Sequence, residues 1–219
     1  MKRILIALIL TALVFSVAGA RKKDKAGAVK DRVYTDSKYN FTLEIPEVWK
    51  YNIKKSKDNI RLILTKKQYE IPTQFDRAPS YTTVPKVTVL IDTTSRSLDI
   101  FVDSMLADKF NSKQKKSILS EFPILFGDYR LKKRSKMSVE GTEGVMITAQ
   151  MRYTIQVQRP GSESDKADVV SDFYGGSVFF VKHGSDVLMF HFICEWRYFE
   201  IYLQEFVSLV EGLKFADKE

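Results

Sequence analysis

From Val145 to Val157 every second residue is apolar, and from Thr148 onward the residues between them are polar. Neighbouring side chains of a β-strand point to opposite faces of the sheet, so this segment has one apolar and one wet face. A strand with one apolar and one polar face is typical of an antiparallel sheet with one side in contact with water. The segment is longer than an ordinary strand, and we therefore expect a bend or a bulge within it.

Shorter segments with the same period predict the other strands. They are Phe41–Ile45, Ile60–Lys66, Val87–Ile91, Tyr129–Val139, Ser177–Val181 and Val187–Trp196. The turn residues His183-Gly184-Ser185 predict a hairpin between the last two. The last strand is apolar on both sides, so we expect it at the centre of the sheet with both faces covered.

Two segments have helical periodicity instead. Apolar residues recur at three- and four-residue spacing from Ser97 to Leu106, and Asp99 suits the positive end of a helix dipole. A second helix is predicted from Phe199 to Gly212. Together the elements predict an α+β fold, an antiparallel β-sheet of about seven strands sandwiched by helices. No Pro/Gly/Ser-rich linker divides residues 33–219, which favours a single domain.

The first twenty residues have the pattern of a secretory signal peptide. Lys2 and Arg3 precede an apolar stretch from Ile4 to Val17, and Ala18-Gly19-Ala20 follows it. We expect cleavage after Ala20 and a periplasmic protein. The alternative is a retained membrane tether, but the stretch is short for a hydrocarbon core of about 30 Å. No cysteine follows Ala20 directly, so a lipid anchor on a new N-terminal cysteine is excluded.

Positive charge is concentrated near the expected mature N-terminus. The net charge of +8 falls to +6 on cleavage, because the leader holds two basic residues and no acidic ones. Residues 21–32 include Arg21, Lys22, Lys23, Lys25, Lys30 and Arg32. We expect this segment to be a flexible basic tail. The alternative is an arm that docks on an acidic partner or an anionic membrane surface. Nucleic acid is not an expected partner of an exported protein.

Few residues are available for catalysis or metal binding. The chain has one cysteine, Cys194, and two histidines, His183 and His191. Cys194 lies among apolar residues and is expected to be a buried thiol without a disulfide partner. His191 and Glu195 lie about 13 Å apart along one predicted strand, too far for one metal ion. We expect no catalytic residue, no cofactor and no metal site, and therefore no enzyme.

One charged pattern is a candidate for protein binding. Arg130, Lys132, Arg134 and Lys136 occupy alternate positions of a predicted strand, so they are expected to project from one face as a row. The functional hypothesis is a docking strip for an acidic protein surface. The alternative is a solvated face, or a sheet edge protected against unwanted pairing.

A long segment between two predicted strands contains Tyr69, Phe75 and Tyr81 together with Pro72 and Pro79. Long loops without structure of their own tend to be either functional or disordered. The three aromatic residues are expected either to cover the core as a lid or to form a docking surface. A third hypothesis has them line the pocket of a small-ligand or lipid-binding module.

The segment Tyr39–Trp49 resembles the opening strand and Pro-x-x-Trp corner of the PsbP/Mog1-like family. The closing helix with Leu209, Val210 and Leu213 is similar to the end of that family's domain. The resemblance implies an α/β/α sandwich that binds proteins rather than catalysing a reaction. Within the family, an exported, non-lipidated, basic chain is similar in overall character to a component of the periplasmic flagellar filament sheath of spirochaetes. That similarity implies flagellar filament or sheath subunits as partners, and no stable membrane anchor.

Overall fold

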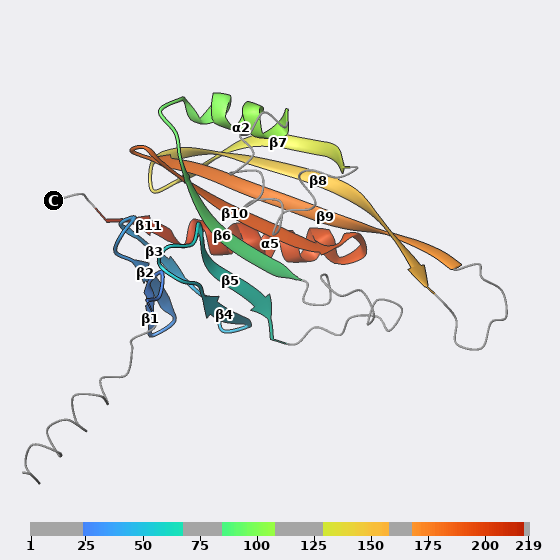
Figure 1. Ribbon diagram of the computed structural model, residues 1–219, viewed down its shortest axis with the longest axis horizontal. Helices are drawn as coiled ribbons and strands as arrows, with labels where there is room; N and C mark the ends of the chain where they lie inside the picture. Colours follow the sequence, from blue (N-terminus) through green and yellow to red (C-terminus); the bar gives the residue numbers. More distant parts are fainter. Residues whose placement is uncertain (1–23, 68–84, 108–128, 158–167, 217–219) are drawn as a thin grey trace, which may run out of the picture.

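The computed structural model describes residues 24–67, 85–107, 129–157 and 168–216 (Figure 1). The predicted signal peptide, residues 21–23 of the predicted tail, and Tyr69, Phe75 and Tyr81 lie outside the described residues.

The strands form two antiparallel sheets. The larger has seven strands in the order β4-β5-β6-β10-β9-β8-β7, and the smaller has four in the order β1-β2-β3-β11. The bounds of the larger sheet are β4 Trp49–Ile53, β5 Ile60–Lys66, β6 Lys86–Thr93, β7 Tyr129–Val139, β8 Thr142–Val157, β9 Asp168–His183 and β10 Asp186–Glu195. Those of the smaller sheet are β1 Ala28–Lys30, β2 Val33–Asp36, β3 Phe41–Glu44 and β11 Leu213–Phe215.

The expected sheet of about seven strands is confirmed, but its membership differs at one edge. Strand β3 lies in the smaller sheet, where it pairs with β2 and with β11. The chain turns at Pro46, and β4 beyond this corner becomes the edge strand of the larger sheet. Arg32 stabilises the corner by donating to the carbonyl oxygens of Ile45 and Trp49 at 2.9 and 2.7 Å.

The predicted flexible tail is wrong for residues 24–32. Ala26 is buried, and Ala28–Lys30 pair with β2 as strand β1. Ala26 also donates its N–H to the carbonyl oxygen of Lys54 at 2.8 Å. The composition of this segment is that of a flexible tail. Its backbone hydrogen bonds and the burial of Ala26 nevertheless offset the conformational entropy that is lost when the segment is ordered.

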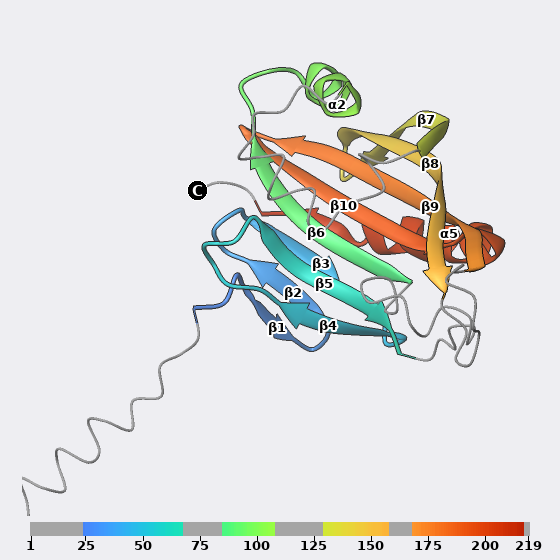
Figure 2. The same cartoon turned by 45° about the vertical axis from the view of Figure 1, so that its right-hand side comes forward.

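The larger sheet has a helix on each face (Figures 1 and 2). Helix α2, Leu98–Leu106, packs Phe101, Val102 and Met105 on one face, and Ser97 caps it by accepting from the Ile100 N–H. Helix α5, Phe199–Glu211, follows a 3₁₀ turn, η2 Trp196–Tyr198, and packs on the other face. Both predicted helices are therefore confirmed. The α5 face is shared with the smaller sheet, which the sequence did not predict.

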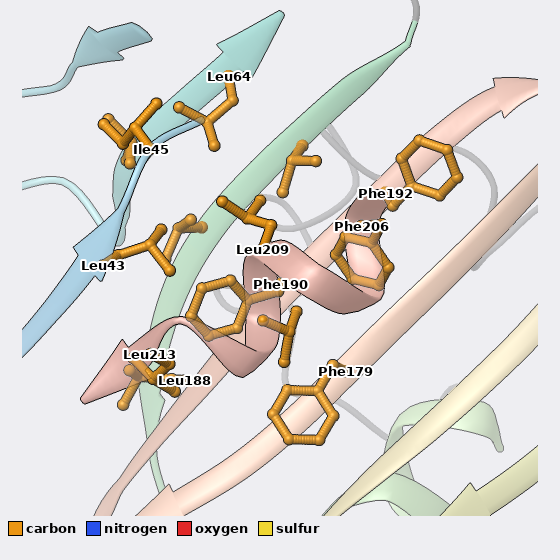
Figure 3. Close-up of a cluster of buried hydrophobic side chains, with 14 of the residues drawn as sticks. Leu43, Ile45, Leu64, Phe179, Leu188, Phe190, Phe192, Phe206, Leu209 and Leu213 are labelled. Carbon is orange, nitrogen blue, oxygen red and sulfur yellow. The ribbon is translucent and has the colours of Figure 1, made fainter. Parts of the chain in front are cut away.

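Strand β10 lies between β6 and β9 and is apolar on both sides, as predicted. Its Leu188, Phe190 and Phe192 belong to the core under α5 and the smaller sheet (Figure 3). Its Val187 and Met189 belong to the core under α2. The larger sheet therefore lies between two hydrophobic clusters. These clusters cover both faces of its central strand, β10.

Four rings form a continuous stack from η2 into the core under α5. Trp196 stacks on Phe199 at a centroid distance of 5.3 Å, Phe199 on Phe192 at 5.6 Å, and Phe192 on Phe206 at 5.3 Å. Gly175 makes room for this stack, because a Cβ there would lie 2.1 Å from the Phe199 ring. The aromatic stack joins β10 to η2 and α5.

A buried ion pair joins the two sheets. The Arg61 side chain on β5 donates through Nε to Asp36 on β2 at 2.7 Å, and both side chains are at most 1% exposed. Arg61 also donates to the carbonyl oxygens of Ala26, Ser56 and Asp58 at 2.7–3.0 Å. A register shift of β5 against β6 falls at Arg61 and separates its neighbours, so that Ile60 packs on the α2 side and Leu62 on the α5 side. The regular period predicted for Ile60–Lys66 would place Ile60, Leu62 and Leu64 on one face, and the register shift makes this wrong for Ile60.

Candidate functional site

The predicted basic row lies on β7, an edge strand of the larger sheet, but it does not occupy one face. The register of β7 against β8 shifts between Leu131 and Lys133, so that Lys132 is the extra residue of a β-bulge. No bulge interrupts the pairing of β8 with β9, so of the bend or bulge expected within Val145–Val157 the bulge is absent, and the bulge found lies in β7. An extra residue exchanges the faces of all positions beyond it.

Arg134 and Lys136 lie on the face that carries α2. They stand opposite Ile147 and Val145, which belong to the core under α2. Arg134 donates to Asp99 at 2.7 Å and also to Asp103, both on α2. These hydrogen bonds, the one to Asp103 first, raise the pKa of Arg134. Lys136 pairs with Glu143 at 2.7 Å. This half of the row is neutralised by acids of the same chain.

Arg130, Lys132 and Lys133 lie toward the α5 face instead. Arg130 and Lys133 stand opposite Gln150 and Thr148, alternate residues of β8 that share this face, and all three cations are exposed. The Lys132 ammonium lies 5.6 Å from the centre of the Trp196 ring. Within the described residues no ion pair uses any of the three. Their charge is available to a partner.

Aromatic side chains continue this surface. Trp196 is half-buried at the end of the aromatic stack, and Phe173 on β9 is 44% exposed. Phe173 stands two residues before Gly175 on the same strand, so it points to the α5 face as well. We call Arg130, Lys132, Lys133, Phe173 and Trp196 the β7 surface.

Sequence reasoning missed Lys133, Phe173 and Trp196. A period of two places Lys133 on the face opposite Lys132, and only the bulge brings both to one side. Phe173 and Trp196 are distant from β7 in sequence, and sheet register together with the turn η2 brings them close. The signal that was present in the sequence is the pair Lys132-Lys133, since adjacent cations break the alternation of the row.

Cys194 on β10 is a free, buried cysteine. Burial, followed by the charge of Glu195, raises the pKa of Cys194 to about 12, so the thiol stays protonated at neutral pH. Among the residues that the structure describes, no three potential metal ligands converge. In the same residues, no helix combines the length and the apolar composition needed to cross a bilayer.

His191 is expected to make the stability of the protein depend on pH. Burial, followed by the charge of Lys86, lowers the pKa of His191 well below its usual 6.5. Below pH 6.5 the unfolded chain takes up a proton that the folded chain refuses, so stability is present above this pH and is lost as the pH falls. We expect the free energy of unfolding to fall by about 2 kcal/mol between pH 7.5 and 5, measured by urea denaturation.

The variant His191→Gln should lose this pH dependence, because an amide does not titrate in the range. His183→Gln is the matched control, since His183 stacks on Phe215 near the β9–β10 turn and lies outside the buried core. An unchanged pH dependence in His191→Gln would contradict the assignment.

Comparison with known proteins finds structural likeness without sequence relatives. No family model matches the sequence, and no curated protein matches it significantly. The structure is similar to PsbP (CyanoP) of Synechocystis sp. PCC 6803, with 11% identity over 91% of this chain and 96% of that chain and a TM-score of 0.44. It is also similar to LpqN, described as involved in cell envelope biogenesis of Mycobacterium tuberculosis, with 9% identity over 81% and 83% of the chains and a TM-score of 0.45.

A third similar structure is PA94 of Pseudomonas aeruginosa, a protein of unknown function described as a putative regulator. It has 14% identity over 85% of this chain and 97% of that chain, with a TM-score of 0.40. The PsbP/Mog1-like family is also the one that the sequence segment Tyr39–Trp49 resembles. At these identities and TM-scores the likeness carries no argument about function, which has to come from the chain itself.

Proposed function

We propose that this chain is a non-enzymatic interaction protein of the periplasm that binds an acidic protein partner through the β7 surface. The observation that supports the proposal is the group of three exposed cations, Arg130, Lys132 and Lys133, beside Trp196 and Phe173. Arginine and tryptophan are enriched among the residues that dominate protein–protein binding energy. Exposed positive charge raises the association rate with an acidic partner.

The specific form of the proposal is a component of the periplasmic flagellar filament sheath of a spirochaete. It rests on the sequence resemblance alone, which extends to the flagellar-coiling protein B of Leptospira. In this form the partners are flagellar filament or sheath subunits with an acidic surface.

The test is binding to isolated periplasmic flagellar filaments, measured by co-sedimentation. The double variant Arg130→Glu/Lys133→Glu is expected to bind at least tenfold more weakly than the unchanged protein, because it turns attraction into repulsion. Binding of the unchanged protein is expected to weaken between about 0.1 and 1 M salt, over which the screening length falls from about 10 to 3 Å.

The matched control is Lys50→Glu/Lys214→Glu, which changes the net charge equally. Lys50 lies on β4 at the opposite edge of the larger sheet, and Lys214 lies on β11. The control should bind like the unchanged protein. Full-strength binding of the Arg130/Lys133 variant would refute the β7 surface as the binding site. Equal weakening of binding in both variants would show a general effect of net charge instead of a specific site.

A second candidate function is a periplasmic small-ligand or lipid-binding module. The pocket residues predicted for it, Tyr69, Phe75 and Tyr81, lie outside the described residues. What favours it is a large cavity elsewhere, between the N-terminal segment and the β4–β5 turn. A thermal-shift screen separates the two functions, because a ligand that binds only the folded state raises the melting temperature.

A further inference from the structure

A cavity of about 780 Å³ lies where the segment before β1 meets the turn between β4 and β5. Its lining consists of Asp24, Lys25, Ile53, Lys54, Lys55, Lys57 and Asp58. Ligand sites commonly have volumes of roughly 300–1,000 Å³. The cavity is therefore large enough for a small organic molecule, and it lies on β4, at the sheet edge opposite the β7 surface.

The backbone around the cavity is held in place from both sides. Lys25 and Lys55 form an antiparallel bridge, and the Ser56 N–H donates to the Asp24 carbonyl oxygen at 3.0 Å. From the interior, the buried Arg61 donates to the carbonyl oxygens of Ser56 and Asp58 at 2.7 and 3.0 Å. A loop fixed by these hydrogen bonds loses little conformational entropy on binding a ligand.

Positive charge dominates the lining. The lining contains four lysines and two aspartates, so the cavity carries an excess of two positive charges. Asp24 is engaged by the Ser56 hydroxyl. Although both acids line the same cavity, no ion pair in the described parts of the chain uses any of the four lysines. The ammonium groups repel one another, and a bound anion would relieve this repulsion.

We propose that this cavity binds a phosphate group carried by a small molecule or a lipid headgroup. Lysine ammonium groups act as point charges with three donors each, which suits the dianionic, tetrahedral phosphate. The nearby guanidinium of Arg61 is already engaged with Asp36 and with carbonyl oxygens, so planar, paired recognition of a carboxylate has no donor here. Ile53 and the size of the cavity leave room for an organic group attached to the phosphate.

The test uses the ¹⁵N-labelled mature chain and pyrophosphate as probe, at constant ionic strength. Saturable NMR shifts are expected at the amides of residues 54–58. Lys54→Ser/Lys57→Ser should weaken pyrophosphate binding at least tenfold, whereas the matched control Lys50→Ser/Lys214→Ser should not, since neither control residue lines the cavity. Shifts that do not saturate, or equal weakening in both variants, would overturn the proposal. Unchanged melting temperatures of the variants exclude unfolding as the cause.

Vesicles distinguish the two sources of the phosphate group. Binding to phosphatidic acid vesicles, but not to phosphatidylcholine vesicles, with the same sensitivity to Lys54→Ser/Lys57→Ser would assign a lipid headgroup. Pyrophosphate binding without vesicle binding would assign a soluble phosphate compound. Vesicle binding that survives the two substitutions, without a pyrophosphate site, would refute the cavity as the binding site. The Lys54/Lys57 variant should still bind filaments, so this proposal and the β7 surface fail independently.

Discussion

Replacing Arg61 with alanine is expected to lower the free energy of unfolding by about 3–5 kcal/mol. The substitution leaves the Asp36 carboxylate buried without its cation. It also removes the guanidinium donor from the carbonyl oxygens of Ser56 and Asp58, and it leaves that of Ala26 with the Tyr34 hydroxyl alone. Burial, followed by the charge of Asp36, raises the pKa of Tyr34, so its hydroxyl stays protonated and remains a donor to Asp36. One neutral hydrogen bond does not replace a guanidinium.

Urea denaturation measures this loss, and amide hydrogen exchange locates it. Exchange should accelerate at Ala26 and along β1, because Arg61 holds the Ala26 carbonyl oxygen. The double variant Arg61→Met/Asp36→Leu is the control. It should lose less than the sum of the single losses, since it leaves no unpaired buried charge. A loss below about 1 kcal/mol for Arg61→Ala would contradict the role assigned to the ion pair.

The second large effect is expected for Phe192→Ala, at about 3–5 kcal/mol. Phe192 is fully buried and stacks on both Phe199 and Phe206, so its removal interrupts the aromatic stack and leaves a cavity between β10 and α5. Figure 3 shows Phe192 and Phe206 together in this core. The energy of the lost ring–ring contacts adds to the energy lost with the buried apolar area. Thermal or urea denaturation measures the result.

The control for this variant is Ile201→Ala on α5, the helix against which Phe192 packs. Ile201 is 64% exposed, so its truncation should change the stability by about 0.5 kcal/mol or less. If Phe192→Ala were as mild as Ile201→Ala, the result would contradict the buried, stacked position of Phe192 between β10 and α5.

Local periodicity was sufficient for most elements of the fold. The helix after Ser97, the helix from Phe199 and the central, doubly covered β10 all follow from repeating apolar positions, which neighbouring residues determine. The assignment of β3 to a second sheet was not predictable in this way. It depends on the turn at Pro46 and on pairing with β11, which are contacts between distant segments.

The candidate site shows the same limit. A strand pattern predicts the face of a residue only while the register is regular. The bulge at Lys132 places both Arg134 and Lys136 on the face opposite that of Arg130. The error at the N-terminal segment has a related cause, because its composition is that of a tail while its backbone pairs with β2 and Lys54. In each case the deciding contact is made by residues distant in the sequence.

The smaller sheet is assembled from opposite parts of the chain, because β11 pairs Leu213 with Leu43. Joining two such distant segments requires closing a very long loop, which slows the final stage of folding. A nascent chain therefore stays without the fourth strand of this sheet until residues 213–215 emerge. Until then Phe41 and Leu43 lack part of their cover, and chaperones that hold extended chains have a binding site during this interval.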